Sequence, residues 1–138
     1  MASTTTSIDI DATPERVWQL IKGFNSLPDW LPYIPSSTLS EGGSVRHLAN
    51  PAGEAIIERL EKYDHAARSY SYSILQAPFP ATDYLSTLQV DGIEGGRASR
   101  VTWSGQFTPV GVSDDEIAAL FHGIYSDGLS ALQQTLRR

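Results

Sequence analysis

Residues 113–138, with the sequence SDDEIAALFHGIYSDGLSALQQTLRR, form the stretch that decides the fold. They begin as a capping box, in which Ser113 accepts a hydrogen bond from the backbone N–H of Glu116 while the Glu116 side chain reaches back. The acidic residues of this first turn also suit the positive end of a helix dipole. Apolar or small residues then recur at three- and four-residue steps: Ile117, Leu120, Phe121, Ile124, Gly128, Leu132 and Leu136. The stretch predicts one long helix, from about Ser113 to Arg137, with an apolar face to bury.

Working outward, residues 38–109 alternate between apolar and polar side chains, and this period of two is typical of strands. Turn residues interrupt the alternation at positions 41–43, 50–53, 64–67, 77–80 and 91–96. That spacing predicts six short strands joined by hairpins, which is an antiparallel meander.

The first part of the chain predicts three smaller elements. Residues 7–11 alternate as a strand, and a short helix follows with Thr13 as its N-cap, Pro14 at its first position and Gly23 at its end. A second helical turn is expected around residues 29–31. The long helix is the element able to cover the apolar face of the sheet. The predicted fold class is α+β: a curved seven-stranded antiparallel sheet wrapped around a long C-terminal helix, with two short helices between strands 1 and 2.

The parity of the strands indicates which side chains face the helix. The assigned inner face consists of Ile56, Glu58, Leu60, Tyr70, Tyr72, Ile74, Tyr84, Ser86, Leu88, Val90, Val101, Trp103, Gly105 and Phe107. Tyrosine and tryptophan are unusual in a plain core because their polar atoms need partners when they are buried. Gly105 and Gly128 permit either close backbone packing or empty space. The face therefore fits two interpretations, a filled core and an amphipathic cavity.

Glu58 is the anomaly of this face, because a buried carboxylate is costly unless it is paired, hydrogen-bonded or protonated. In one interpretation a local bulge turns Glu58 outward, or a nearby arginine such as Arg46 satisfies it. In the other, Glu58 is the polar anchor of an apolar pocket and a candidate general acid or base with a raised pKa. Tyr72 and Tyr84 are then placed to bond to it or to a ligand.

Composition excludes several classes of function. With no cysteine among 138 residues, the chain has no disulfide, zinc-thiolate site, iron–sulfur cluster or thiol nucleophile. The three histidines lie in different predicted elements, so no metal site and no cofactor are expected. A formal charge of −6 argues against nucleic acid as a partner. Neither a signal peptide nor a membrane span is visible, so we expect a cytoplasmic protein.

Several segments resemble the START-like superfamily, also called SRPBCC. They are the sequence ATPERVW at 12–18, Trp30-Leu31-Pro32, and Glu58-Arg59-Leu60 with its turn at Asp64. The chain is most similar to the bacterial polyketide cyclase/dehydrase and lipid-transport branch, over nearly its whole length. The resemblance implies a single helix-grip domain, residues 1–138, with a deep cavity between sheet and long helix. It carries over no shared catalytic motif.

The function expected from these observations is binding of a small, largely apolar molecule that is lipid-, polyketide- or aromatic-like. The candidate ligand-binding residues are Glu58, Tyr72, Tyr84, Ser86, Trp103, Phe121, Ile124 and Gly128. Two alternatives stay open: a cyclase or dehydratase that uses Glu58 as acid/base, and a protein-interaction or chaperone module. The second and third strands lack the lysine with which related plant hormone receptors bind a carboxylate. The oligomeric state stays open between monomer and homodimer.

Overall fold

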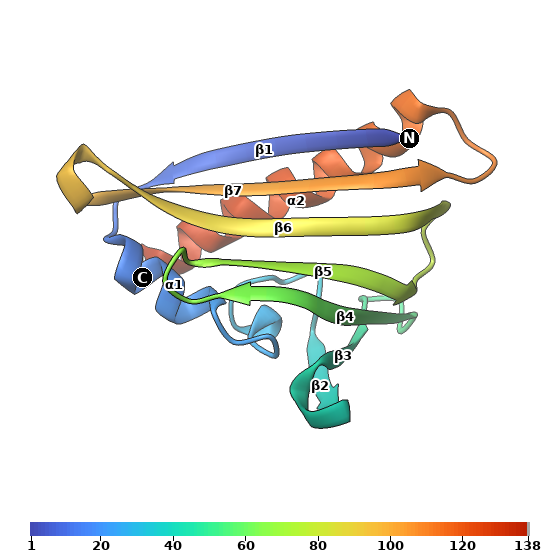
Figure 1. Ribbon diagram of the computed structural model, residues 1–138, viewed down its shortest axis with the longest axis horizontal. Helices are drawn as coiled ribbons and strands as arrows, with labels where there is room; N and C mark the ends of the chain where they lie inside the picture. Colours follow the sequence, from blue (N-terminus) through green and yellow to red (C-terminus); the bar gives the residue numbers. More distant parts are fainter. Residues whose placement is uncertain (138) are drawn as a thin grey trace.

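The computed structural model describes residues 1–137, which form one antiparallel sheet packed on a long helix (Figure 1). The strands are β1 (Ala2–Ile10), β2 (Ser36–Ser40), β3 (Val45–Ala49), β4 (Ala55–Asp64), β5 (Ser69–Gln76), β6 (Ala81–Ile93) and β7 (Ala98–Pro109). The helices are α1 (Pro14–Ile21), α2 (Asp114–Leu136) and the 3₁₀ turns η1 (Leu27–Asp29), η2 (Glu41–Gly43) and η3 (Glu94–Gly96). This order confirms the α+β prediction, with the short helical elements α1 and η1 between the first two strands.

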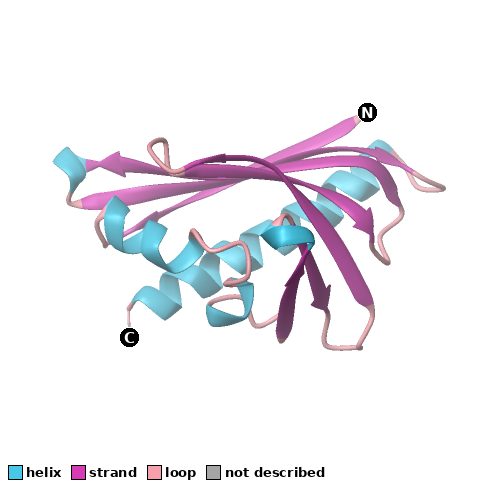
Figure 2. Ribbon diagram, turned by 60° about the horizontal axis from the view of Figure 1, so that its bottom comes forward, coloured by secondary structure: helices cyan, strands magenta, loops and turns pink. Residues whose placement is uncertain are grey.

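The sheet has the strand order β1-β7-β6-β5-β4-β3-β2, and all neighbours are antiparallel. The chain therefore forms one edge, crosses to the other edge through α1 and η1, and returns as a meander until β7 pairs with β1. The sheet curves, and α2 runs along its concave face, nearest to β1 and β7 (Figure 2). The fold places β3, β4 and β5 opposite the segment that follows α1, and β6 and β7 opposite α2.

The capping box that starts α2 is present, with Ser113 Oγ accepting from the backbone N–H of Glu116 at 3.1 Å and Glu116 bonding back. The predicted apolar stripe is wrong at Leu120, which is 39% exposed. The buried face instead consists of Ile117, Phe121, Tyr125, Gly128, Leu129, Leu132 and Leu136. From Ile117 the buried face continues by two steps of four, through Phe121 to Tyr125, and so leaves Leu120 to one side.

The first part of the chain differs from the prediction in its boundaries. Strand β1 begins at Ala2, five residues before the predicted start, because its whole length pairs with β7. Helix α1 begins as predicted, with Thr13 Oγ1 accepting from the backbone N–H of Arg16. It is capped by Lys22, one residue before Gly23. The second short helix lies at Leu27–Asp29 rather than at 29–31.

The predicted inner face is confirmed in all four strands where parity was assigned. A register shift does fall between Ile57 and Glu58, yet Glu58 stays inside with 6% of its surface exposed. The extra residue of this irregularity is Leu75 of β5, between the partners of Ile57 and Glu58, so the alternation of β4 continues through Glu58 and no bulge turns its carboxylate outward.

Gly105 and Gly128 serve close packing rather than empty space. A Cβ atom at Gly128 would lie 2.7 Å from Cζ3 of Trp103 and 3.0 Å from Cδ1 of Leu31. A Cβ atom at Gly105 would collide with the hydroxyl of Tyr125. The two glycines thus let the large rings of β7 and α2 approach the opposite backbone. Among residues 1–137, no helix is long and apolar enough to cross a membrane.

Candidate functional site

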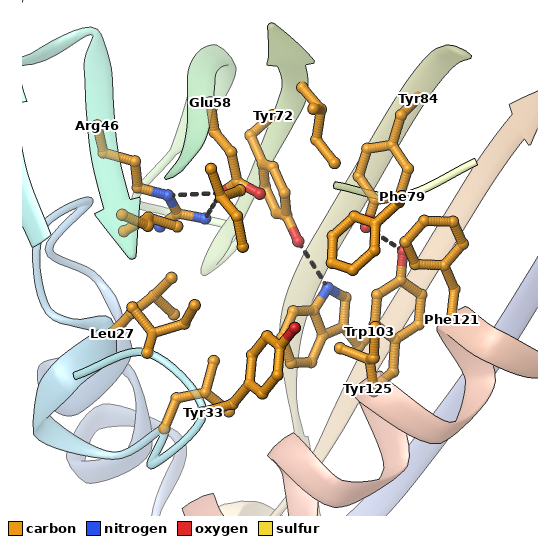
Figure 3. Close-up of a pocket in the computed structure, with 16 residues that line it drawn as sticks. Leu27, Tyr33, Arg46, Glu58, Tyr72, Phe79, Tyr84, Trp103, Phe121 and Tyr125 are labelled. Carbon is orange, nitrogen blue, oxygen red and sulfur yellow. Dashed lines mark hydrogen bonds and ion pairs between the residues drawn. The ribbon is translucent and has the colours of Figure 1, made fainter. Parts of the chain in front are cut away.

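A small cavity lies between the concave face of the sheet, α2 and the segment around η1 (Figure 3). Its volume is about 40 Å³, which is room for a few water molecules and far less than the deep cavity that the resemblance implies. Its walls are Leu27, Leu31, Tyr33, Ile34, Arg46, Leu48, Ile56, Glu58, Tyr72, Ile74, Phe79, Tyr84, Trp103, Phe121, Ile124 and Tyr125. Two of these sixteen side chains are charged, and the two form a pair.

That pair joins Arg46 of β3 to Glu58 of β4, which lie directly opposite each other in the antiparallel register. Nε and Nη2 of Arg46 both contact Oε1 of Glu58, at 2.8 and 2.7 Å. Nη1 donates to the backbone carbonyl of Phe24 at 3.1 Å. Both side chains are almost completely buried, so bulk water screens the attraction between the two charges only weakly.

Aromatic rings hold the guanidinium of Arg46 from two sides. Its Cζ lies 4.2 Å from the ring centre of Phe24 and 4.8 Å from that of Tyr72, both within cation–π range. Burial by itself lowers the pKa of Arg46, but Glu58, Tyr70 and Tyr72 together outweigh that effect, so the pKa is raised and the guanidinium stays protonated. Burial raises the pKa of the Glu58 carboxyl, and Arg46 opposes that rise.

The opposite end of the cavity is neutral and is held by hydrogen bonds between aromatic side chains. Trp103 Nε1 donates to the hydroxyl of Tyr72 at 3.1 Å and to Ser86 Oγ at 3.0 Å. The hydroxyls of Tyr84 and Tyr125 bond to each other. Burial raises the pKa of Tyr72 and Tyr84 well above the ordinary value, and raises that of Tyr125 to about 12. These hydroxyls therefore remain protonated donors at neutral pH.

Of the predicted ligand-binding residues, six line the cavity: Glu58, Tyr72, Tyr84, Trp103, Phe121 and Ile124. Ser86 and Gly128 do not. Ser86 is 1% exposed, and its hydroxyl bonds to Trp103 and to the carbonyl of Ser104. Gly128 packs against Trp103 and borders an outer depression instead.

Sequence reasoning named Arg46 as a possible partner of Glu58, which the structure confirms, but it did not name Arg46 or Tyr125 as wall residues. The direction of Arg46 could not be predicted, because Val45 and Arg46 are both buried and two neighbouring buried residues break the alternation of β3. Tyr125 could have been found, since it stands four residues after Phe121 on the helix. Of the other walls, Ile56 and Ile74 belong to the predicted inner face, and Leu48 lies on β3. The rest come from the segments around η1 and before β6, where no periodicity orients a side chain: Leu27, Leu31, Tyr33, Ile34 and Phe79.

Two outer depressions, each of about 280 Å³, adjoin the cavity. The first shares Leu31, Tyr33 and Ile124 with the cavity and lies between the segment after η1 and α2. The second lies beside the turn that joins β5 to β6 and shares four walls with the cavity: Ile74, Phe79, Tyr84 and Phe121. Only side chains therefore separate the cavity from the surface on these two sides.

The family profile described as "Polyketide cyclase / dehydrase and lipid transport" matches residues 1–137. The chain belongs to this family. An uncharacterized protein from Bacillus thuringiensis is 64% identical to it, with a TM-score of 0.97 over 99% of this chain and 100% of that one. The protein XoxI from Bacillus cereus is 67% identical, with a TM-score of 0.95 over 97% and 94% of the two chains.

A more distant structure is the Zhui aromatase/cyclase from Streptomyces sp. R1128. It is 15% identical to this chain, with a TM-score of 0.79 over 99% of this chain and 94% of that one, and so it shows the shared fold alone. No curated protein matches the sequence. Family membership is consistent with binding of a hydrophobic ligand, as the sequence predicts.

Chemically, the site offers an apolar surface, a neutralised ion pair and several hydroxyl donors. Glu58 is the single carboxylate among the cavity walls of the described chain, and Arg46 holds one of its oxygens. Within residues 1–137 no group of three or more His, Asp or Glu side chains is arranged to hold a metal ion. The arrangement suits recognition of a ligand better than proton transfer, which needs a carboxyl free to gain and lose a proton.

Proposed function

We propose that the protein binds a small, largely apolar molecule between the sheet and α2. The observation that carries the proposal is the composition of the cavity wall, which is aromatic and aliphatic except for the Arg46–Glu58 pair. Ligand sites in proteins have this composition, with a mainly apolar surface and a few polar groups that fix orientation. A core that served packing alone would gain stability from apolar residues in place of the ion pair.

The cavity has to widen to hold such a molecule. Tyr33 is 37% exposed and Phe79 belongs to the turn before β6, so neither is fixed by a strand or a helix. Movement of these two side chains would join the cavity to the outer depressions without breaking the sheet. Entry past Tyr33 exposes mainly apolar groups, since the depression there is walled by Leu31, Pro32, Ile124 and Ala131 among others.

The proposal is tested with the neutral fluorescent probe N-phenyl-1-naphthylamine and with native mass spectrometry of freshly purified protein. We expect the probe to bind at about one equivalent and a copurified small molecule to be displaced by it. Ile124→Trp fills the cavity wall and should weaken probe binding by about tenfold or more. Leu120→Trp adds the same bulk on the exposed side of the same helix and should leave it unchanged. Failure of the folded protein to bind the probe would reject the proposal.

The two alternative functions, an enzyme that uses Glu58 as acid/base and a protein-interaction module, have less support from the structure than ligand binding has. An acid/base role for Glu58 needs a carboxyl that exchanges protons, whereas Arg46 makes two contacts with one of its oxygens. A protein-interaction role needs an exposed apolar surface, and the exposed large hydrophobic residues are scattered over different elements: Tyr33, Leu39, Tyr63, Leu75, Leu85, Val110 and Leu120.

A further inference from the structure

The further inference concerns the chemical class of the ligand, and it rests on the proposed function. Each nitrogen group of the Arg46 guanidinium already has an acceptor. Nε and Nη2 contact Oε1 of Glu58, and Nη1 donates to the carbonyl of Phe24. Rings of Phe24 and Tyr72 cover the guanidinium as well. The cavity therefore contains an arginine but presents no free positive charge to a ligand.

Only one of the two carboxylate oxygens of Glu58, Oε1, is in contact with Arg46. Both contacts from Arg46 reach Oε1, and within residues 1–137 no side chain or backbone donor bonds to Oε2. The carboxylate nevertheless lines the cavity and is 6% exposed. An ionised carboxylate accepts several hydrogen bonds. Oε2 is not one of the buried atoms that lack a partner, so it stays accessible from the cavity, where a donor from water or a ligand can reach it. Oε2 is thus an acceptor for which the protein supplies no donor.

Tyr72 adds a complementary group beside this acceptor. Its hydroxyl accepts a hydrogen bond from Trp103 Nε1 and keeps its own proton, which burial holds in place. On the side of Tyr72 away from Glu58, the cavity walls are the rings of Phe79, Tyr84 and Trp103 (Figure 3). Stacked and edge-to-face contacts with such rings favour a flat aromatic ligand.

We propose that the site selects uncharged aromatic molecules that carry a hydroxyl group, and that it rejects carboxylates. The hydroxyl donates to Oε2 of Glu58, and a nearby oxygen of the ligand can accept from Tyr72. A carboxylate in the same place would face the negative charge of Glu58, while Arg46 is already neutralised. In a water-poor site that repulsion is strong. Glu58 is therefore the residue that determines specificity by charge.

Three bicyclic probes of similar size test this proposal at neutral pH: 2-naphthol, 2-methoxynaphthalene and 2-naphthoate. The first is a neutral donor, the second is neutral without a donor, and the third is an anion. We expect the parent protein to bind 2-naphthol about tenfold or more tightly than either of the other two, by calorimetry or fluorescence titration. Because this comparison uses the unmodified protein, it does not depend on how any variant folds.

Glu58→Gln sharpens the test, because it removes the negative charge and leaves Arg46 unneutralised. In a folded variant, checked by circular dichroism, the preference should reverse, with 2-naphthoate gaining about tenfold or more. Glu61→Gln removes a carboxylate from an exposed position of the same strand and should change nothing. Equal binding of 2-naphthoate and 2-naphthol to the parent would overturn the inference and leave the proposed function standing. If neither these probes nor the neutral dye binds, the proposed function itself fails.

Discussion

The two ends of the buried face are held together by different physics. At the β6–β7–α2 end, Trp103 stacks on Tyr125 with ring centres 4.7 Å apart, and neutral hydroxyl and indole groups share hydrogen bonds. At the β3–β4 end, the Arg46–Glu58 pair sits among aromatic rings. At the neutral end, packing and hydrogen bonds stabilise the fold at little electrostatic cost. At the charged end, the attraction between Arg46 and Glu58 first has to offset the free energy of removing two ions from water.

Under the proposed function, the neutral end serves stability and the charged end serves recognition. Aromatic rings with satisfied polar atoms are an efficient way to fill a core. A buried ion pair, by contrast, is often matched or exceeded in stability by apolar residues of similar volume. A charged pair whose second carboxylate oxygen has no protein donor is what the proposed ligand site requires. The predictions below separate the two ends, in order of decreasing effect.

The largest loss of stability is expected at the neutral end, from the substitution Trp103→Ala. The side chain is 4% exposed, contacts Tyr125 and Trp30 ring to ring, and bonds to Tyr72 and Ser86. Its removal should lower the free energy of unfolding by about 3–5 kcal/mol, measured by chemical denaturation, because a cavity forms that neighbours only partly fill. Leu120→Ala, on the exposed side of α2, should change it by less than about 0.5 kcal/mol. If Trp103→Ala lowered the free energy of unfolding by no more than Leu120→Ala does, the ring of Trp103 would face open space.

The next effect is expected from breaking the charged pair one partner at a time. An unpaired buried Glu58 would make Glu58→Gln at least as stable as the parent. Because Arg46 is paired with it, the same change should instead cost about 3 kcal/mol, as should Arg46→Met. The double variant Arg46→Met/Glu58→Gln should recover most of that loss, since no buried charge remains. A double-mutant cycle checks this, and additive losses would show that the two residues act independently.

The loss in Arg46→Met should also depend on pH. Without the arginine, burial acts unopposed to raise the pKa of Glu58 in the folded chain above its unfolded value. The variant then suffers no penalty below the unfolded pKa of about 4.3, where the carboxyl is protonated in both states. The penalty grows as pH rises through the raised folded pKa. Unfolding of parent and variant from acidic to neutral pH measures it, and a constant difference would contradict the assignment.

A smaller effect is expected from Tyr125→Phe, which removes one hydroxyl from the neutral end and leaves its ring in place. The hydroxyl of Tyr84 loses its partner in a buried position, and this should cost about 1–2 kcal/mol. Tyr33→Phe is the matched control, because Tyr33 is partly exposed and water can replace any bond it makes. If Tyr125→Phe and Tyr33→Phe lowered the free energy of unfolding equally, the hydrogen bond between Tyr84 and Tyr125 would make no contribution of its own to stability.

Much of the fold could be predicted from particular residues. The helix start signals at Thr13-Pro14 and Ser113–Glu116 are local chemistry, and so they appear in the sequence as they do in the structure. Parity placed Glu58, Tyr72 and Trp103 on one face because adjacent residues of a strand point to opposite sides. Element boundaries such as the start of β1 depended on pairing with β7, which no local signal reports.

The site was less predictable, for a physical reason. Whether the inner face encloses a cavity depends on how side chains from β7 and α2 interdigitate, and Gly105 and Gly128 fit either outcome until Tyr125 and Trp103 are in place. Arg46 sits in a five-residue strand whose buried positions do not alternate. Its contact with Glu58 follows from the register of β3 on β4, which is a tertiary property.

The smallest effect is expected from an ion pair with the same chemistry as Arg46–Glu58 but on the surface. Arg100 of β7 donates two hydrogen bonds to Asp9 of β1, at 2.8 and 3.1 Å, and both side chains are about half exposed. Those bonds lower the pKa of Asp9. Water and salt screen such a pair, so Arg100→Gln should leave the free energy of unfolding unchanged within error. A carboxyl titration by NMR should nevertheless show the pKa of Asp9 rising toward its ordinary value. If Arg100→Gln destabilised the protein as much as Arg46→Met, burial would not be what sets the charged end of the cavity apart.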